Sequence, residues 1–121
     1  MMRFSLDSLV ILIQFILVIL FIISGYFDVS VAITHKSIHY VYFESQRDHA
    51  KDPLIIWFAG GPGCSGMISM LQENGPFIIE PGTEKIRLND NAWNKRAGLA
   101  YFEVPAGVGF STSSSNETIT D

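Results

Sequence analysis

A fully apolar segment that runs straight into a glycine-rich turn is the feature that most constrains this sequence. Residues 54–58 read Leu-Ile-Ile-Trp-Phe, which predicts a strand buried on both faces. Residues 60–63 read Gly-Gly-Pro-Gly and predict a tight turn. A short helix is expected at about 65–73, because Asn-Gly-Pro at 74–76 ends it. This order places backbone N–H groups at one end of a sheet, where they can stabilise an anion.

Two phosphate-binding patterns share these glycines. Residues 61–66 fit G-x-G-x-x-G, and Glu80 lies where an acidic ribose partner would be sought. A proline inside the turn and the early end of the helix argue against a dinucleotide site. The glycine spacing also fits a P-loop, but Met67 and Ile68 stand where that motif needs Lys and Ser or Thr, which excludes it.

Further strands are expected on both sides of this unit. Residues 26–33 and 38–44 predict a hairpin across the break at 34–37, 77–79 predict a short strand, and 99–104 predict a buried strand. Polar residues at 46–53 predict a loop, those at 84–91 a surface hairpin or loop, and 105–109 a second glycine-rich turn.

The N-terminus carries an apolar run from residue 9 to residue 23, in which only Gln14 is polar. Arg3 precedes the run and small residues follow it, which is typical of a signal peptide. The alternative is an uncleaved signal-anchor that holds the chain in a membrane through residues 9–23. Cleavage is expected either near Ser24-Gly25 or after the small residues at 30–32. The chain therefore divides into a targeting segment, 1–25, and a domain portion, 26–121, and enters the secretory pathway.

Composition excludes several classes of function. Among the 121 residues, 48% are hydrophobic, too many for a polar disordered chain. Twelve acidic and 8 basic side chains give a net charge of −4, which does not favour a nucleic acid as a partner. Cys64 is the only cysteine, so the chain can form neither an internal disulfide nor a cysteine-based zinc cluster.

Several motifs, in order, resemble those of the serine carboxypeptidase family. Residues 57–66, W-F-A-G-G-P-G-C-S-G, resemble the family's W-L-N-G-G-P-G-C-S-S, and residues 73–77, E-N-G-P-F, resemble its E-x-G-P-F. W-N-K at 93–95 and P-A-G-V-G-F-S at 105–111 resemble its W-N-K and S-P-A-G-V-G-F-S. S-G-Y at 24–26 and Y-F-E-S at 42–45 resemble its opening segments. The resemblance spans residues 24–111.

The resemblance implies the N-terminal part of an α/β-hydrolase fold, with mixed-sheet strands and an oxyanion-hole loop, incomplete on its own. The reaction it implies removes the C-terminal residue of a peptide or protein through an acyl-enzyme, without a cofactor or metal. Carried over by position, Gly61 supplies a backbone N–H to the oxyanion hole. Gly60 helps to hold the terminal carboxylate of the substrate through its backbone.

The nucleophile of the family does not occur in this sequence. No G-x-S-x-G is present, and His35, His39 and His49 all precede the glycine loop. We expect all three histidines to be surface residues. The chain is therefore expected to be the N-terminal portion of a longer enzyme and to be inactive alone. A non-catalytic secreted or membrane-anchored module is the alternative outside the enzymes.

Three further positions carry expectations from the resemblance. Ala59 stands where the family has an Asn that donates to the substrate's carboxylate, so an acyltransferase of the same family is the second enzymatic alternative. Cys64 is expected to pair with a cysteine outside the chain. Asn116 begins an N-x-T sequon, which predicts glycosylation of a secreted protein. The expected location is extracellular, lysosomal or vacuolar.

Overall fold

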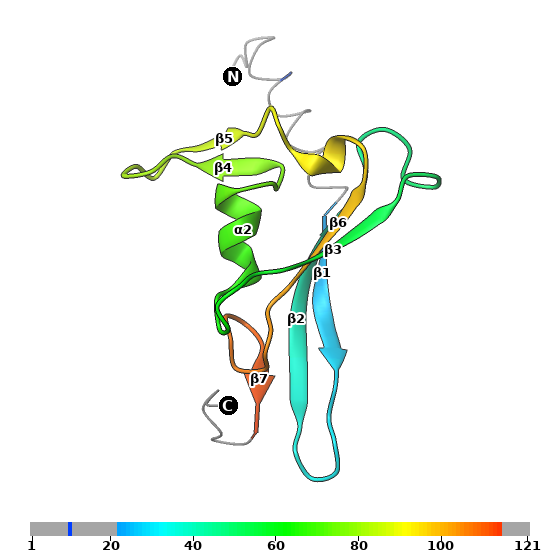
Figure 1. The fold of residues 1–121 in the computed structure, drawn as a ribbon, viewed down its shortest axis with the longest axis vertical. Helices are drawn as coiled ribbons and strands as arrows, with labels where there is room; N and C mark the ends of the chain where they lie inside the picture. The colour runs from blue at the N-terminus through cyan, green and yellow to red at the C-terminus, as the bar shows by residue number, and fades with distance from the viewer. Residues whose placement is uncertain (1–9, 11–21, 115–121) are drawn as a thin grey trace, which may run out of the picture.

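A mixed sheet, one short helix and a small second hairpin make up the described chain (Figure 1). The structure is a computed structural model, and it describes residue 10 and residues 22–114. Its elements are β1 (Ile22–Asp28), β2 (Lys36–Phe43), β3 (Leu54–Phe58), α2 (Gly66–Gln72), β4 (Phe77–Ile79), β5 (Ile86–Leu88), the 3-10 turn η1 (Trp93–Lys95), β6 (Gly98–Phe102) and β7 (Thr112–Ser113). The expected strands, turns and helix are present, and several of them begin or end at other residues than expected.

The larger sheet has the strand order β1-β2-β6-β3, with β7 paired to β2. The predicted hairpin is confirmed, since β1 and β2 pair antiparallel from Ile22↔Phe43 to Asp28↔Ser37. Strands β3 and β6 are parallel, and Phe58 pairs with Phe102 at their last residues. Because the carboxyl ends of parallel strands meet at one edge, the glycine loop after β3 and the turn after β6 leave the sheet side by side.

The helix α2 covers one face of this sheet (Figure 1). The core there contains Val41, Phe43, Leu99 and Tyr101, against which Ile22, Ile55, Trp57, Met67, Met70 and Phe77 pack. Gly66 begins the helix directly on β6, where an added Cβ would lie 2.7 Å from the carbonyl oxygen of Phe102. Only glycine allows this approach, which fixes the start of α2 on the end of β6.

The expectation that residues 54–58 are buried on both faces is wrong. In β3, Leu54, Ile56 and Phe58 are 58%, 51% and 58% exposed. β3 lies at the edge of the sheet and α2 covers only the face that carries Ile55 and Trp57. On the other face the rings of Phe27, Tyr40, Phe102 and Phe58 follow one another across the four strands. The expected burial of the strand at 99–104 is confirmed for Leu99, Ala100 and Tyr101.

The first strand begins earlier than its sequence indicates. It was expected at 26–33 but spans Ile22–Asp28, because its register with β2 starts at Ile22↔Phe43. The residues after it form the hairpin end, where Val31 bridges Thr34 and Ala32 has φ 54°. The predicted boundary after residue 25 therefore falls inside β1.

Several predictions fall on residues that the structure does not describe. Most of the apolar run at 9–23 and the sequon at Asn116 lie outside the described ranges. Within residues 10 and 22–114, no helix has the length and apolarity needed to cross a membrane.

Candidate active site

The glycine loop at residues 59–64 connects β3 to α2 and is exposed over most of its length. Gly61 has φ +137° and Gly63 has φ +94°, in the region that favours glycine. A Cβ on Gly61 would lie 3.0 Å from the backbone nitrogen of Gly63 and 3.1 Å from that of Cys64. Within residues 22–114, the backbone N–H groups of Gly60, Gly61, Gly63 and Cys64 donate to no partner. The loop therefore presents unpaired donors at the carboxyl edge of the sheet.

The other expected positions in the loop lie as follows. Ala59 is half-buried at the end of β3, and Gly60 and Cys64 are exposed. The space around a Cβ on Gly60 is open to 4 Å among the described residues, which leaves room for a ligand. Cys64 is a free thiol in this structure.

A fully buried carboxyl group lies beneath the loop. Glu103 directly follows β6 and is 0% exposed. Ser65, the N-cap of α2, donates its hydroxyl to Oε1 of Glu103, and the same Oγ accepts from the N–H of Met67. The N–H of Phe110 donates to Oε2 of Glu103 at 2.8 Å. These donors compensate the loss of hydration that burial imposes on the carboxyl group.

His39 extends this network into the hairpin. Its Nδ1 lies 3.0 Å from Oε2 of Glu103, and its Nε2 lies 2.9 Å from Oγ of Ser24. The ring is in contact with Tyr26 and Phe110, at centroid distances of 5.2 and 5.3 Å. Because both oxygens of Glu103 accept from other donors, Nδ1–H of His39 donates to Oε2 as well.

The prediction that the three histidines lie on the surface is therefore wrong for His39, which is 7% exposed. His35 and His49 are exposed, as predicted. The alternation of β2 turns His39 to the side of Val41 and Phe43, the face that α2 covers. This alternation was a readable signal in the sequence for the side of the sheet on which His39 lies.

Backbone contacts lock the turn after β6 around the glutamate. The hydroxyl of Ser111 donates to the carbonyl oxygen of Glu103 at 2.6 Å and accepts from the N–H of His39 at 2.8 Å. The N–H of Glu103 donates to the carbonyl oxygen of His39 at 3.0 Å. A Cβ on Gly109 would lie 1.9 Å from Oε1 of Glu103, so a side chain at this position would displace the carboxyl group. The segment 105–111 therefore packs over the carboxyl group of Glu103.

The motif E-N-G-P-F at 73–77 ends α2 and anchors it to β6. The hydroxyl of Tyr101 donates to Oδ1 of Asn74 at 2.8 Å, and burial, with a smaller effect of Glu73, raises the pKa of Tyr101 well above its usual value. A Cβ on Gly75 would lie 2.0 Å from the carbonyl oxygen of Met70. Among the described residues, Nδ2 of Asn74 and Nε1 of Trp57 are buried without a hydrogen-bond partner.

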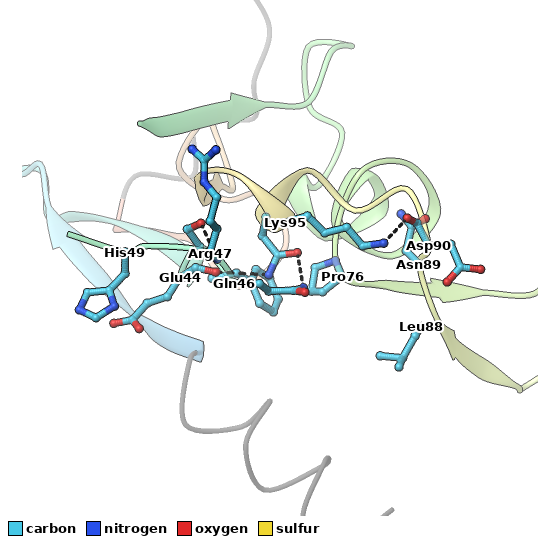
Figure 2. A pocket seen from close by; sticks show the side chains of 12 residues that line it. Glu44, Gln46, Arg47, His49, Pro76, Leu88, Asn89, Asp90 and Lys95 are labelled. Atoms are coloured by element: carbon cyan, nitrogen blue, oxygen red, sulfur yellow. Dashed lines mark hydrogen bonds between the residues drawn. The ribbon is translucent and has the colours of Figure 1, made fainter. Parts of the chain in front are cut away.

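A separate pocket of about 610 Å³ opens at the other end of the sheet, where β2 ends and β3 and β6 begin (Figure 2). It is lined by residues within 43–49 and 88–95 and by Pro76. The lining contains no residue of the glycine loop. The pocket and the candidate active site are therefore different places on the molecule.

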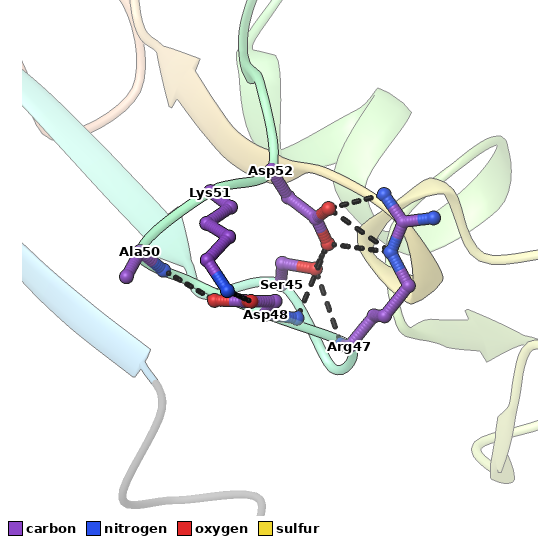
Figure 3. Close-up of polar contacts among 6 residues, drawn as sticks. All are labelled: Ser45, Arg47, Asp48, Ala50, Lys51 and Asp52. Carbon is purple, nitrogen blue, oxygen red and sulfur yellow. Dashed lines mark hydrogen bonds and ion pairs between the residues drawn. The ribbon is translucent and has the colours of Figure 1, made fainter.

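The loop between β2 and β3 is closed by one buried carboxylate (Figure 3). The side chain of Asp52 is 3% exposed and accepts three hydrogen bonds from the guanidinium of Arg47. Nε of Arg47 lies 3.0 Å from Oδ1, and Nη2 also donates to Oδ1. Ser45 donates its hydroxyl to Oδ2 at 2.5 Å. Arg47 first, and Ser45 second, lower the pKa of Asp52 to about 2.

Comparison with known proteins agrees with the fold and the loop. The family model for serine carboxypeptidases matches residues 19–121. The chain therefore belongs to the serine carboxypeptidase family. The chain is also similar to the crystal structure of Kex1(delta)p, a prohormone-processing carboxypeptidase from Saccharomyces cerevisiae, with a TM-score of 0.65 and 29% identity over 79% of this chain and 21% of that one. The described residues thus form part of an α/β-hydrolase fold, as predicted.

Two curated relatives show how much of such a protein the chain spans. It is 43% identical to the lysosomal protective protein of Mus musculus over 81% of this chain and 20% of the relative. It is 47% identical to a carboxypeptidase Y homolog of Arthroderma benhamiae over 64% of this chain and 16% of the relative. The chain therefore covers about a fifth or less of these relatives.

Proposed function

We propose that this chain supplies the oxyanion loop of a serine-type carboxypeptidase, which removes C-terminal residues from peptides or proteins through an acyl-enzyme. The observation that carries the proposal is the exposed loop at 59–64, whose unpaired N–H groups lie at the carboxyl edge of the sheet. The serine nucleophile, the aspartate and the histidine belong to a further part of the same protein. These residues alone do not turn over substrate, because an oxyanion donor stabilises only the charge that a nucleophile creates.

Gly61 donates its N–H to the oxyanion of the tetrahedral intermediate. Its φ of +137° and the nearby nitrogens of Gly63 and Cys64 leave no room for a side chain. A backbone donor is held by the loop itself, so it loses no rotamer entropy when the intermediate forms. One such donor typically contributes about 3 kcal/mol to transition-state stabilisation.

Gly60 holds the terminal carboxylate of the substrate through its backbone, and Ala59 lies beside it without a donor. The missing amide at Ala59 is the observation that favours the second candidate, an acyltransferase of the same family. Loss of a hydrogen bond to a charged group weakens carboxylate binding by about 1.5–3 kcal/mol. A substrate without a free carboxylate would not be affected by this loss.

The protein acts in the secretory pathway, as an extracellular, lysosomal or vacuolar enzyme. The apolar run at 9–23 supports this location as a signal peptide or, if uncleaved, as a membrane anchor. The name of the mouse relative refers to the lysosome. Asn116 is the proposed glycosylation site, and Cys64 forms a disulfide with a cysteine outside these residues.

The test is labelling by a serine-directed fluorophosphonate. The 121-residue chain and the longest in-frame product of its gene are treated in parallel, and the labelled peptide is identified by mass spectrometry. We expect label only on the longer product, at a serine in a G-x-S-x-G segment. A longer product that takes no label would support the third candidate, a non-catalytic module. Label on a serine within residues 1–121 would overturn the proposal.

A further inference from the structure

Four side chains from separate elements form a continuous network next to the glycine loop. His39 and Glu103 are buried in it, Ser65 is half-buried and Ser24 is exposed. Ser24 of β1 contacts His39 of β2 at 2.9 Å, and His39 contacts Glu103 at 3.0 Å. Glu103 in turn accepts from Ser65, the residue that directly follows the glycine loop. The network therefore ties the end of the loop to two strands of the sheet.

Both ends of the loop are attached to the end of β6, the first to Phe102 and the second to Phe102 and Glu103. At the first end, Phe58 pairs with Phe102 in the parallel ladder. At the second end, Gly66 packs on the carbonyl of Phe102 and Ser65 bonds to Glu103. Between these ends, the N–H groups of the described loop residues Gly60, Gly61, Gly63 and Cys64 make no hydrogen bonds. The position of the free amides therefore depends on the two attachments.

We infer that Glu103 and Ser65 are positioning residues, which hold the amide of Gly61 in place for the reaction. The inference rests on the proposed function. Ser65 acts through the loop and Glu103 acts through Ser65. Misplacement of a catalytic group by about 1 Å can lower a rate by 100-fold, so a single hydrogen bond at the end of the loop can control catalysis.

A carboxyl group suits this position better than an amide. Three donors converge on Glu103: the hydroxyl of Ser65, the N–H of Phe110 and the ring of His39. A carboxylate offers two acceptor oxygens, whereas a glutamine offers one and turns an NH2 toward another donor. Glu103→Gln therefore keeps the shape of the side chain and breaks at least one of these three hydrogen bonds.

The experiment is steady-state hydrolysis of a peptide by the longest in-frame product of the gene. Ser65→Gly removes the hydroxyl that reaches Glu103 but weakens the helix cap only slightly, because glycine is also a good N-cap. We expect Ser65→Gly and Glu103→Gln to lower kcat by about 10- to 100-fold and to leave KM within about threefold. Ser65→Thr keeps the hydroxyl and should restore most of kcat.

Ser69→Ala is the matched control, since Ser69 is a buried serine of the same helix that does not touch Glu103. It should leave kcat within about twofold, as expected for a side chain outside the reaction. Amide hydrogen exchange gives a second readout. Exchange should rise in peptides that cover the first turn of α2, where the N–H groups of Met67 and Ile68 donate to Ser65, and stay unchanged in those that cover β6, for both Ser65→Gly and Glu103→Gln.

Each outcome decides one point. Unchanged kcat and exchange in Ser65→Gly would overturn the inference and leave the proposed function intact. An equal loss of kcat in Ser69→Ala would also overturn it, because the effect would then be general destabilisation. If Glu103→Gln does not fold, Ser65→Gly and its rescue by threonine decide the question. A wild-type product with neither turnover nor label would overturn the proposed function, and the inference with it.

Discussion

Nδ1 of His39 lies 3.0 Å from Oε2 of Glu103, and 64 positions separate the two residues in the chain. The contact joins the hairpin strand β2 to the end of β6, beside the N-terminus of α2. It also explains how an ionisable residue of β2 is buried away from water. The two residues are buried together and satisfy one another.

His39→Ala should destabilise the folded protein by about 1–3 kcal/mol, because it leaves the hydroxyl of Ser24 and one oxygen of Glu103 without this partner. The measurement is the urea midpoint of the longest in-frame product. His35→Ala is the control, since His35 is an exposed residue before the same strand. Equal midpoints for the two variants would contradict the structural role of His39.

Residues 26–121, expressed alone, should be aggregated or molten. One face of the sheet exposes Phe27, Leu54, Ile56 and Phe58, and each is more than half exposed. A start at residue 26 also removes the first half of β1. The checks are size-exclusion chromatography and thermal unfolding followed by circular dichroism. A monomer with a cooperative transition would refute this expectation.

Asp52 should stabilise the protein in a pH-dependent manner. Its pKa is lowered to about 2 in the folded chain, chiefly by Arg47, whereas an unperturbed Asp has a pKa of about 3.9. The folded state therefore binds its proton less readily, and the stabilisation is complete above about pH 4 to 5 and is lost as the pH falls toward 2. Asp52→Asn should lower the urea midpoint at pH 6 and match the wild type near pH 2. A difference that is independent of pH would show that the charge of Asp52 is not its cause.

The local features of this fold could be predicted from the sequence. The segment 54–58, the turn after it and the helix between Ser65 and Glu73 lie where the apolar run and the glycines indicate. Each depends on neighbouring residues only. The pairing of β1 with β2 also follows from a short connection between β-prone segments. The pairing of β4 with β5 does not, because the polar residues 84–91 indicate a surface hairpin or loop of their own.

The features that depend on distant partners could not be predicted. Apolar composition shows that β3 can be buried on both faces but not that a helix covers only one of them. The burial of His39 depends on Glu103, and no local pattern connects these positions. Glu103 itself carried one readable signal, a single acidic residue that ends an apolar segment and precedes a glycine-rich turn.

Ala59→Asn tests which substrate the site takes. In the longest in-frame product, the new amide should strengthen binding of peptides with a free C-terminal carboxylate by about 1.5–3 kcal/mol. Peptides with an amidated C-terminus are the control and should bind as before. No gain on either peptide, together with turnover of an acyl-sugar, would favour the acyltransferase.

Gly61→Val tests the oxyanion loop most directly. The added side chain would enter the space beside the nitrogens of Gly63 and Cys64, on a backbone with φ +137°. Gly82→Ala is the control for backbone strain, since Gly82 also has a positive φ, of +74°, with open space around it among the described residues. The measurement is the pre-steady-state rate of acylation of the longest in-frame product by a peptide ester, with the dissociation constant determined in parallel. The account predicts that Gly61→Val slows acylation by about 100-fold or more with little change in binding, as loss of one oxyanion donor does. Acylation by Gly61→Val at the rate of the wild type would contradict it.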